Sequence, residues 1–139
     1  MLKLIFCGAR DWPYLDPILT VMSRLKDNLG PFVIIEGEAA GADTLSKLAA
    51  KKLGLEWEEC PAKWKLHGKA AGPIRNTQMR VEGKANGVVA FHPDLSKSKG
   101  TKNMVEQSLN AGLPVWTSEM SDEQLMQFIL QLRRKVNGL

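Results

Sequence analysis

The segment Phe32-Val33-Ile34-Ile35-Glu36-Gly37 contains four consecutive apolar residues, three of them β-branched, and ends at an acidic residue and a glycine. A run this short, bounded by turn-forming residues, is typical of a strand buried on both faces, and such strands belong to parallel sheets. Residues 4–7, which end at Gly8, and residues 87–91 have the same character. These three runs therefore predict the centre of a parallel sheet.

Segments with apolar residues at helical spacing separate the runs. Two more strands are predicted at residues 55–60 and 114–116, and helices are predicted at residues 15–29, 43–53, 73–85, 101–111 and 121–136. We expect Asp43 to cap the second helix, Pro73 to begin the third after a loop over residues 61–72, and Ser121 with Gln124 to form a capping box. The alternation predicts an α/β, Rossmann-like three-layer domain: a five-stranded parallel sheet with helices on both faces.

The composition narrows the class of protein. The 139 residues, 44% apolar and 24% charged, correspond to one globular domain over residues 1–139. No run of apolar residues is long enough for a membrane-spanning helix, and the start of the chain is no signal peptide, so we expect a cytoplasmic protein. Cys7 and Cys60 are expected to be reduced thiols. The cysteine and histidine spacing predicts no metal site, and no cofactor is expected.

Small and polar residues follow three of the predicted strands, at residues 8–12, 37–43 and 92–101. In open α/β sheets, ligands bind beyond the carboxyl ends of the strands, where helix N-termini favour anions. The segments contain neither a dinucleotide-binding GxGxxG motif nor a P-loop. A single glycine here often serves only the strand-to-helix turn. Three such segments at one sheet edge predict a phosphate-bearing ligand.

Residues 67–79 read His-Gly-Lys-Ala-Ala-Gly-Pro-Ile-Arg-Asn-Thr-Gln-Met. The predicted helix start places Arg75 and Asn76 in its first turn, where a cation opposes the helix dipole. An anionic ligand would explain an arginine there, because guanidinium matches phosphate geometry. A salt bridge to an acidic side chain would explain it equally well.

These residues carry a family resemblance. Residues 7–11, Glu36-Gly37 through Gly41-Ala42-Asp43, Trp64 with residues 67–76 and Met79, and Lys99-Gly100-Thr101 together resemble the YspA-like branch of the SLOG superfamily. The resemblance covers residues 2 to about 116 and leaves the last helix, about 121–136, outside. It implies a Rossmann-like fold whose relatives, among them the LOG phosphoribohydrolases and DprA, bind nucleotides or nucleotide-derived signals.

The resemblance also implies roles for single residues. Arg75 and Met79 match the Arg-x-x-x-Met motif of the LOG enzymes, but Met104 stands where those enzymes have a catalytic Glu. Whether the chain is an enzyme is therefore left open. Candidate catalytic residues are Glu36, His67 and Arg75, with Glu38, Asp43 and Asp94 as further acids near the expected pocket.

Three hypotheses follow. The first is a nucleotide or nucleotide-derivative binding domain, possibly a sensor or scavenger of a nucleotide signal, with the ligand held by Gly8, Arg10, Gly37, Gly41, Asp43, Arg75, Asn76, Gly100 and Thr101. The second is a hydrolase that cleaves an N-glycosidic or phosphate bond of a nucleotide. The third is single-stranded DNA binding through Trp64 and the basic residues Lys63, Lys65, Lys69, Arg75 and Arg80. Relatives of this superfamily are often dimers, so the resemblance is compatible with a homodimer, which nothing in the sequence itself shows.

Overall fold

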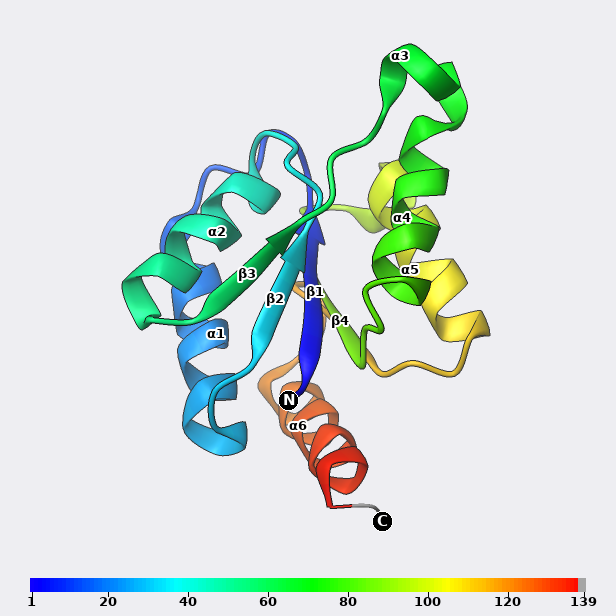
Figure 1. Cartoon of the computed structure of the whole chain (residues 1–139). Helices are drawn as coiled ribbons and strands as arrows, with labels where there is room; N and C mark the ends of the chain where they lie inside the picture. The colour runs from blue at the N-terminus through cyan, green and yellow to red at the C-terminus, as the bar shows by residue number, and fades with distance from the viewer. Residues whose placement is uncertain (138–139) are drawn as a thin grey trace.

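The computed structural model describes residues 1–137 and contains one five-stranded parallel sheet. The strand order is β3-β2-β1-β4-β5 (Figure 1). The strands are β1 (Lys3–Gly8), β2 (Val33–Glu36), β3 (Glu56–Glu59), β4 (Gly87–Phe91) and β5 (Val115–Thr117). The helices are α1 (Leu15–Leu29), α2 (Ala42–Leu53), α3 (Trp64–His67), α4 (Ala71–Val81), α5 (Gly100–Asn110) and α6 (Asp122–Val136). The predicted fold class is therefore confirmed.

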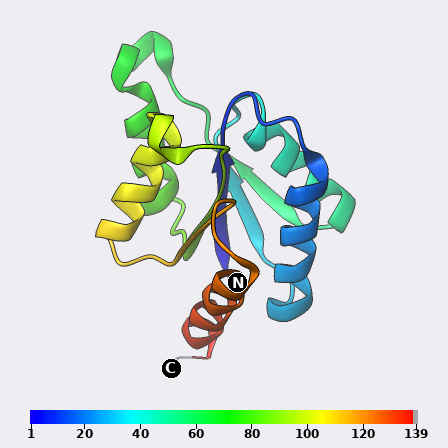
Figure 2. The same ribbon diagram turned by 180° about the vertical axis from the view of Figure 1, so that it is seen from behind.

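Helices cover both faces of the sheet, as Figures 1 and 2 show. Alternate residues of β4 explain how: Val89 packs in the core under α1, α2 and α6, whereas Val88 packs in the core under α4 and α5. Side chains of successive strand residues point to opposite faces, so a strand covered on both sides must be apolar throughout. The continuous apolar runs of β1, β2 and β4 in the sequence meet this requirement.

The strand order creates a switch point next to β1. The chain runs outward from β1 through β2 to β3, and then returns to place β4 on the other side of β1. Gly8 at the end of β1 pairs with Phe91 at the end of β4. The segments that leave these two strands diverge to opposite faces, which opens a crevice at their carboxyl ends.

Several local predictions are wrong, and one is confirmed. Asp43 does not cap α2: the cap position is Gly41, and Asp43 is the second helical residue. Residues 61–72 are not a plain loop, because they contain α3, a 3₁₀ turn at Gly68–Ala70 and the start of α4. Pro73 does not begin α4: the helix begins at Ala71, so Arg75 and Asn76 lie in its second turn rather than its first. The capping box of Ser121 and Gln124 is confirmed.

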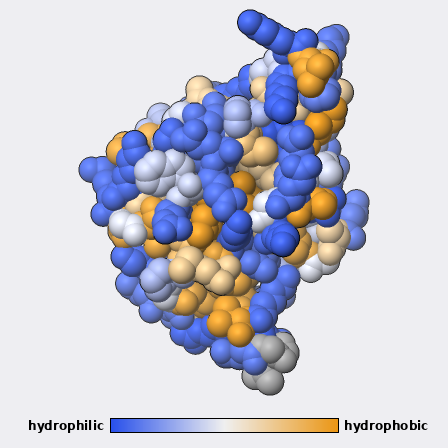
Figure 3. All heavy atoms as spheres, in the orientation of Figure 1, coloured by the Kyte–Doolittle hydropathy of each residue, from blue (hydrophilic) through white to orange (hydrophobic). Residues whose placement is uncertain are grey.

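The segment around α3 projects from the rest of the molecule (Figure 1). It carries exposed apolar surface among hydrophilic side chains (Figure 3), including Leu66, which is 71% exposed, and Trp64, which is 47% exposed. Across residues 1–137, no helix combines the length and the apolar character needed to span a bilayer.

Candidate functional site

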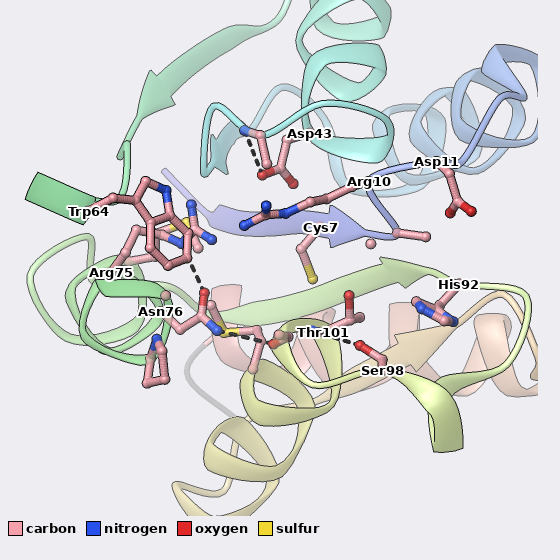
Figure 4. A pocket seen from close by; sticks show the side chains of 18 residues that line it. Cys7, Arg10, Asp11, Asp43, Trp64, Arg75, Asn76, His92, Ser98 and Thr101 are labelled. Carbon is pink, nitrogen blue, oxygen red and sulfur yellow. Dashed lines mark hydrogen bonds between the residues drawn. The ribbon is translucent and has the colours of Figure 1, made fainter. Parts of the chain in front are cut away.

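A pocket of about 360 Å³ lies at the carboxyl ends of β1 and β4 (Figure 4). Four stretches of chain form its walls: the turn after β1, the approach to α2, the α3–α4 segment, and the loop that leads from β4 into α5. The lining residues are Cys7, Gly8, Ala9, Arg10, Asp11, Ala39, Asp43, Trp64, Gly72, Pro73, Arg75, Asn76, Met79, His92, Ser98, Gly100, Thr101 and Met104.

The structure brings most of the predicted ligand-binding residues together around this pocket. Gly8, Arg10, Asp43, Arg75, Asn76, Gly100 and Thr101 all line it. Gly37 lines a second cavity, of about 260 Å³, which adjoins the first. Gly41 lines neither cavity. It packs against the backbone at Ala9, where an added Cβ would lie 2.3 Å from the carbonyl oxygen, so its part is to let the two chain segments approach.

The predicted catalytic residues are dispersed. Only Arg75 lines the pocket; Glu36 and His67 line neither cavity. Glu36 is fully buried at the end of β2, and its Oε2 accepts a 2.6 Å hydrogen bond from the backbone N–H of Glu38. Burial, together with the side-chain hydrogen bond to Glu38, raises the pKa of Glu36 to about 9. Glu36 is therefore protonated at neutral pH and is removed from the pocket.

Arg75 is held in a fixed orientation. Its Nη1 donates a hydrogen bond of 2.6 Å to the carbonyl oxygen of Gly37, and its Nε donates one of 3.0 Å to Oδ1 of Asn76. Within residues 1–137, no carboxylate lies at ion-pair distance from Arg75. The salt bridge that the sequence left open as an explanation for Arg75 is thus not formed in the described chain.

The side chain of Asn76 makes its hydrogen bonds to other residues of the protein. Its Oδ1 accepts from Arg75, and its Nδ2 donates to the carbonyl oxygen of Gly100 at 3.2 Å and to Oδ1 of Asn103 at 3.1 Å. Both amide hydrogens therefore have protein partners, and the side chain is buried. Asn76 positions Arg75 and the start of α5 in this arrangement.

Arg10 also lines the pocket, and its side chain is exposed. Its guanidinium carbon lies 5.3 Å from the centre of the Trp64 ring, which is cation–π geometry. At an exposed site such a contact contributes about 0.5–1 kcal/mol, little enough for a ligand to replace it. Arg10 and Trp64 thus form an exposed wall held by one weak contact, in contrast to the hydrogen-bonded Arg75.

Asp43 supplies the buried carboxyl of the pocket. It is 5% exposed, and its Oδ2 accepts a 3.2 Å hydrogen bond from the backbone N–H of Ala39 (Figure 4). Burial raises the pKa of Asp43 to about 6, against the lowering effects of the Ala39 amide and the positive charge of Arg75. A carboxyl with this pKa can exchange a proton near neutral pH.

The start of α5 is already partly capped. Oγ of Ser98 accepts hydrogen bonds from the backbone N–H groups of Thr101 at 3.0 Å and of Lys102 at 3.3 Å. These two amides become available to an anion only if Ser98 turns away. Met104, one turn further along α5, is buried and places no carboxyl where the LOG resemblance expects one.

Sequence reasoning missed several lining residues. Asp11, His92 and Ser98 lie inside the segments that were expected to form the crevice, so their place after a strand was a usable signal. Cys7 gave no such signal, because it looks like an ordinary strand residue. Burial raises the pKa of its thiol far above the usual value, which makes it a packing group rather than a nucleophile. Ala9, Ala39, Trp64, Gly72, Pro73, Met79 and Met104 complete the set of residues that were not assigned to the site.

Comparison with known proteins places this site in context. The sequence model of the YspA, cpYpsA-related SLOG family matches residues 2–67. The gene 61 protein of Mycobacterium phage D29 is 33% identical over an alignment of 124 residues, and the match covers 83% of this chain and 94% of that protein. The X-ray structure of DNA processing protein A (DprA) from Streptococcus pneumoniae matches with a TM-score of 0.65 and 16% identity, over 96% of this chain and 56% of that chain. The chain thus spans little more than half of the DprA chain, and that likeness shows the fold alone.

Proposed function

The chain belongs to the YspA, cpYpsA-related SLOG family, and from this premise we propose that it binds a nucleotide or a nucleotide derivative in the pocket between β1 and β4. The volume of about 360 Å³ lies within the usual range for small-molecule sites. The position at the switch point of a parallel sheet is where α/β domains bind such ligands.

The anchored guanidinium of Arg75 carries the proposal. No carboxylate forms an ion pair with this half-buried cation in the described chain, and the nearby Asp43 offsets its charge only in part, so an anionic ligand would compensate the remainder. Its hydrogen bonds to Gly37 and Asn76 fix the plane of the guanidinium before any ligand arrives. A preoriented guanidinium matches two oxygens of a phosphate group, which is the feature that nucleotides share.

A thermal-shift panel tests this function. The ligands are AMP, ATP, cyclic dinucleotides, NAD, ADP-ribose and cyclic ADP-ribose, with inorganic phosphate as a control for unspecific anion binding. A ligand at about 100 times its Kd stabilises the protein by roughly 2.7 kcal/mol. The matched variants are Arg75→Ala and Arg134→Ala, the latter on the exposed surface of α6. We expect a shift that is lost only in Arg75→Ala; the absence of any nucleotide shift, or equal shifts in both variants, would contradict the proposal.

A nucleotide hydrolase is the second candidate, and Asp43 is the observation that favours it. A carboxyl of pKa about 6 inside the pocket can act as a general acid or base toward water and a glycosidic or phosphate bond. Met104 argues against the LOG type of catalysis, so any such activity would depend on Asp43. Chromatography of each bound nucleotide after incubation with wild-type protein and Asp43→Asn tests this: product formed only by the wild type supports hydrolysis.

The basic residues proposed for single-stranded DNA binding do not form one continuous surface in the structure. Arg75 faces the pocket, Nε of Arg80 donates to Gln107 at 3.0 Å, and the ring of Trp64, which is 47% exposed, is in cation–π contact with Arg10. Lys63, Lys65 and Lys69 remain exposed around α3. These contacts leave no stacked array of aromatic and basic side chains within residues 1–137, so we do not propose DNA binding. Dimer formation stays a prediction from the resemblance.

A further inference from the structure

Some residues lie between the two adjoining cavities and line both of them. The smaller one is lined by Arg10, Gly37, Glu38, Ala39, Ala40, Pro61, Ala62, Trp64 and Arg75. Four of these residues, Arg10, Ala39, Trp64 and Arg75, also line the larger pocket. Both arginines therefore stand between the compartments and can be reached from either side.

The two arginines keep unused hydrogen-bond donors at this boundary. Arg75 uses Nη1 and Nε for Gly37 and Asn76, so the two hydrogens of Nη2 make no hydrogen bond within residues 1–137. The guanidinium of Arg10 is in contact with the Trp64 ring and, in the same part of the chain, has no hydrogen-bond or ion-pair partner. Figure 4 shows the two guanidinium groups on the same side of the pocket. The boundary thus offers two positive charges with free donors.

The compartments on either side differ in character. The larger one contains polar groups that can recognise a nucleoside, among them Asp43, His92 and Thr101. The smaller one is walled mainly by small side chains, such as Ala40, Pro61 and Ala62. Its acidic residue, Glu38, shares Lys47 with Glu59, at 3.0 and 2.7 Å, so this side of the compartment keeps a negative charge. Each compartment is therefore suited to an uncharged organic group rather than to a phosphate.

We propose that the ligand is a pyrophosphate-linked compound, with a nucleoside in the larger compartment, a second sugar or nucleoside in the smaller one, and its two phosphates at Arg10 and Arg75. This inference rests on the proposed nucleotide binding and narrows its ligand class. A pyrophosphate diester carries two negative charges, which the two guanidinium groups balance. A mononucleotide fills one compartment only and leaves the other to water.

Calorimetric titration with AMP, ADP and ADP-ribose separates the contributions of the second phosphate and of the second sugar to the binding affinity. The three ligands share adenosine 5′-phosphate; ADP adds the second phosphate, and ADP-ribose adds the second sugar. For wild-type protein we expect affinity to rise along this series, with ADP-ribose bound at least tenfold more tightly than AMP. Equal affinity for AMP and ADP-ribose would overturn the inference while leaving nucleotide binding intact. If none of the three binds, the proposed function itself fails.

Two substitutions test whether the second sugar binds in the smaller compartment. Ala62→Trp fills only the smaller compartment, and Pro73→Trp adds bulk only at the rim of the larger one. We expect Ala62→Trp to lower ADP-ribose affinity to that of ADP while leaving AMP and ADP within twofold of wild type. Pro73→Trp should weaken all three ligands. Unchanged ADP-ribose binding by Ala62→Trp would refute the second compartment. Ala40→Trp, at an exposed position of the same compartment, serves if Ala62→Trp does not fold.

Discussion

Nη1 of Arg75 lies 2.6 Å from the carbonyl oxygen of Gly37, so a side chain on α4 is hydrogen-bonded to the backbone that follows β2. The contact spans 38 positions of sequence and crosses from the α4–α5 side of the sheet to the start of the turn that leads into α2. It is close enough that a Cβ at position 37 would lie 2.3 Å from Nη1, so any side chain there would have to displace the guanidinium. The orientation of the cation that we propose to bind the ligand therefore depends on a residue with no side chain.

Arg75→Lys tests whether the shape of the guanidinium matters beyond its charge. Lysine keeps the positive charge but cannot bond Gly37 and Asn76 while also presenting two donors to a phosphate. Hydrogen bonds to charged groups contribute about 1.5–3 kcal/mol, so we expect nucleotide affinity to fall roughly ten- to a hundredfold. Calorimetric titration measures the loss. Affinity equal to that of wild type would show that Arg75 acts only as a point charge.

Gly41→Ala and Gly30→Ala form a matched pair. Both glycines have left-handed backbone, with φ of +75° and +76°. An added Cβ meets nothing within 4 Å at Gly30 but lies 2.3 Å from the carbonyl oxygen of Ala9 at Gly41. We expect Gly30→Ala to lower the free energy of unfolding by about 1–2 kcal/mol and Gly41→Ala to lower it by clearly more. Urea denaturation checks both; equal losses would mean that the turn after β1 yields without strain.

Glu36→Gln should make folding stability less dependent on pH. The unfolded chain ionises Glu36 at its ordinary pKa of 4.5, whereas the folded protein retains the proton up to a pKa of about 9. Between these values the unfolded state binds fewer protons, so wild-type stability falls as pH rises, by up to roughly tenfold in the folding constant per pH unit. The amide has no such proton to lose, and its advantage over wild type should grow from pH 5 to pH 8.5.

Urea denaturation at several pH values measures the Glu36→Gln effect, with Glu56→Gln at an exposed position of β3 as the control. The control should follow wild type at every pH. A constant difference between Glu36→Gln and wild type would contradict a neutral Glu36 in the folded protein.

Asp43→Asn should alter the pH dependence of nucleotide binding. Above its pKa of about 6, the Asp43 carboxylate offsets part of the positive charge of Arg75 and Arg10. Protonation removes that negative charge, so we expect the affinity for ADP-ribose to rise by two- to tenfold as pH falls from 7.5 to 5. ADP-ribose is the suitable probe because its pyrophosphate has no proton to exchange in this range.

In Asp43→Asn we expect tighter binding at pH 7.5 and a flatter profile. His92 also lines the pocket, so His92→Gln is measured in parallel. A profile that Asp43→Asn leaves unchanged but His92→Gln abolishes would assign the effect to the histidine.

The sheet was predictable from sequence because its information is local. Apolar runs such as residues 4–7 and 87–91 must be buried on both faces, and the capping box at Ser121 and Gln124 marks the last helix directly. The α3 segment was not predictable in this way. Its residues Trp64 and Leu66 stay exposed, so they leave no core-facing periodicity. Because residues 61–72 were predicted to be a loop, the predicted start of α4, Pro73, lies two residues after its observed start, Ala71.

The site was predictable in its location more than in its contacts. Because Gly8, Arg10 and Thr101 follow strands in the sequence, they are correctly predicted to lie together at one edge of the sheet. The position of a residue after a strand cannot distinguish a side chain that lines the pocket from one that hydrogen-bonds within the protein. The side-chain amide of Asn76 donates to Gly100 and Asn103, and the carboxyl of Glu36 is buried and accepts from the backbone N–H of Glu38. The partners of Asn76 lie 24 and 27 positions away in the sequence, and no sequence spacing predicts that they come within hydrogen-bond distance.

The hydrogen bonds of Arg75 and Asn76 have a dynamic consequence. They connect the segment at Gly37, the helix α4 and the start of α5 at Gly100, so the pocket walls cannot open independently. Amide hydrogens around residues 37–43 and 100–103 should then exchange with solvent through one common opening rather than through two separate fluctuations. A molecule that bridges the arginines would slow exchange in both segments to the same extent, although more than fifty residues separate them in the chain.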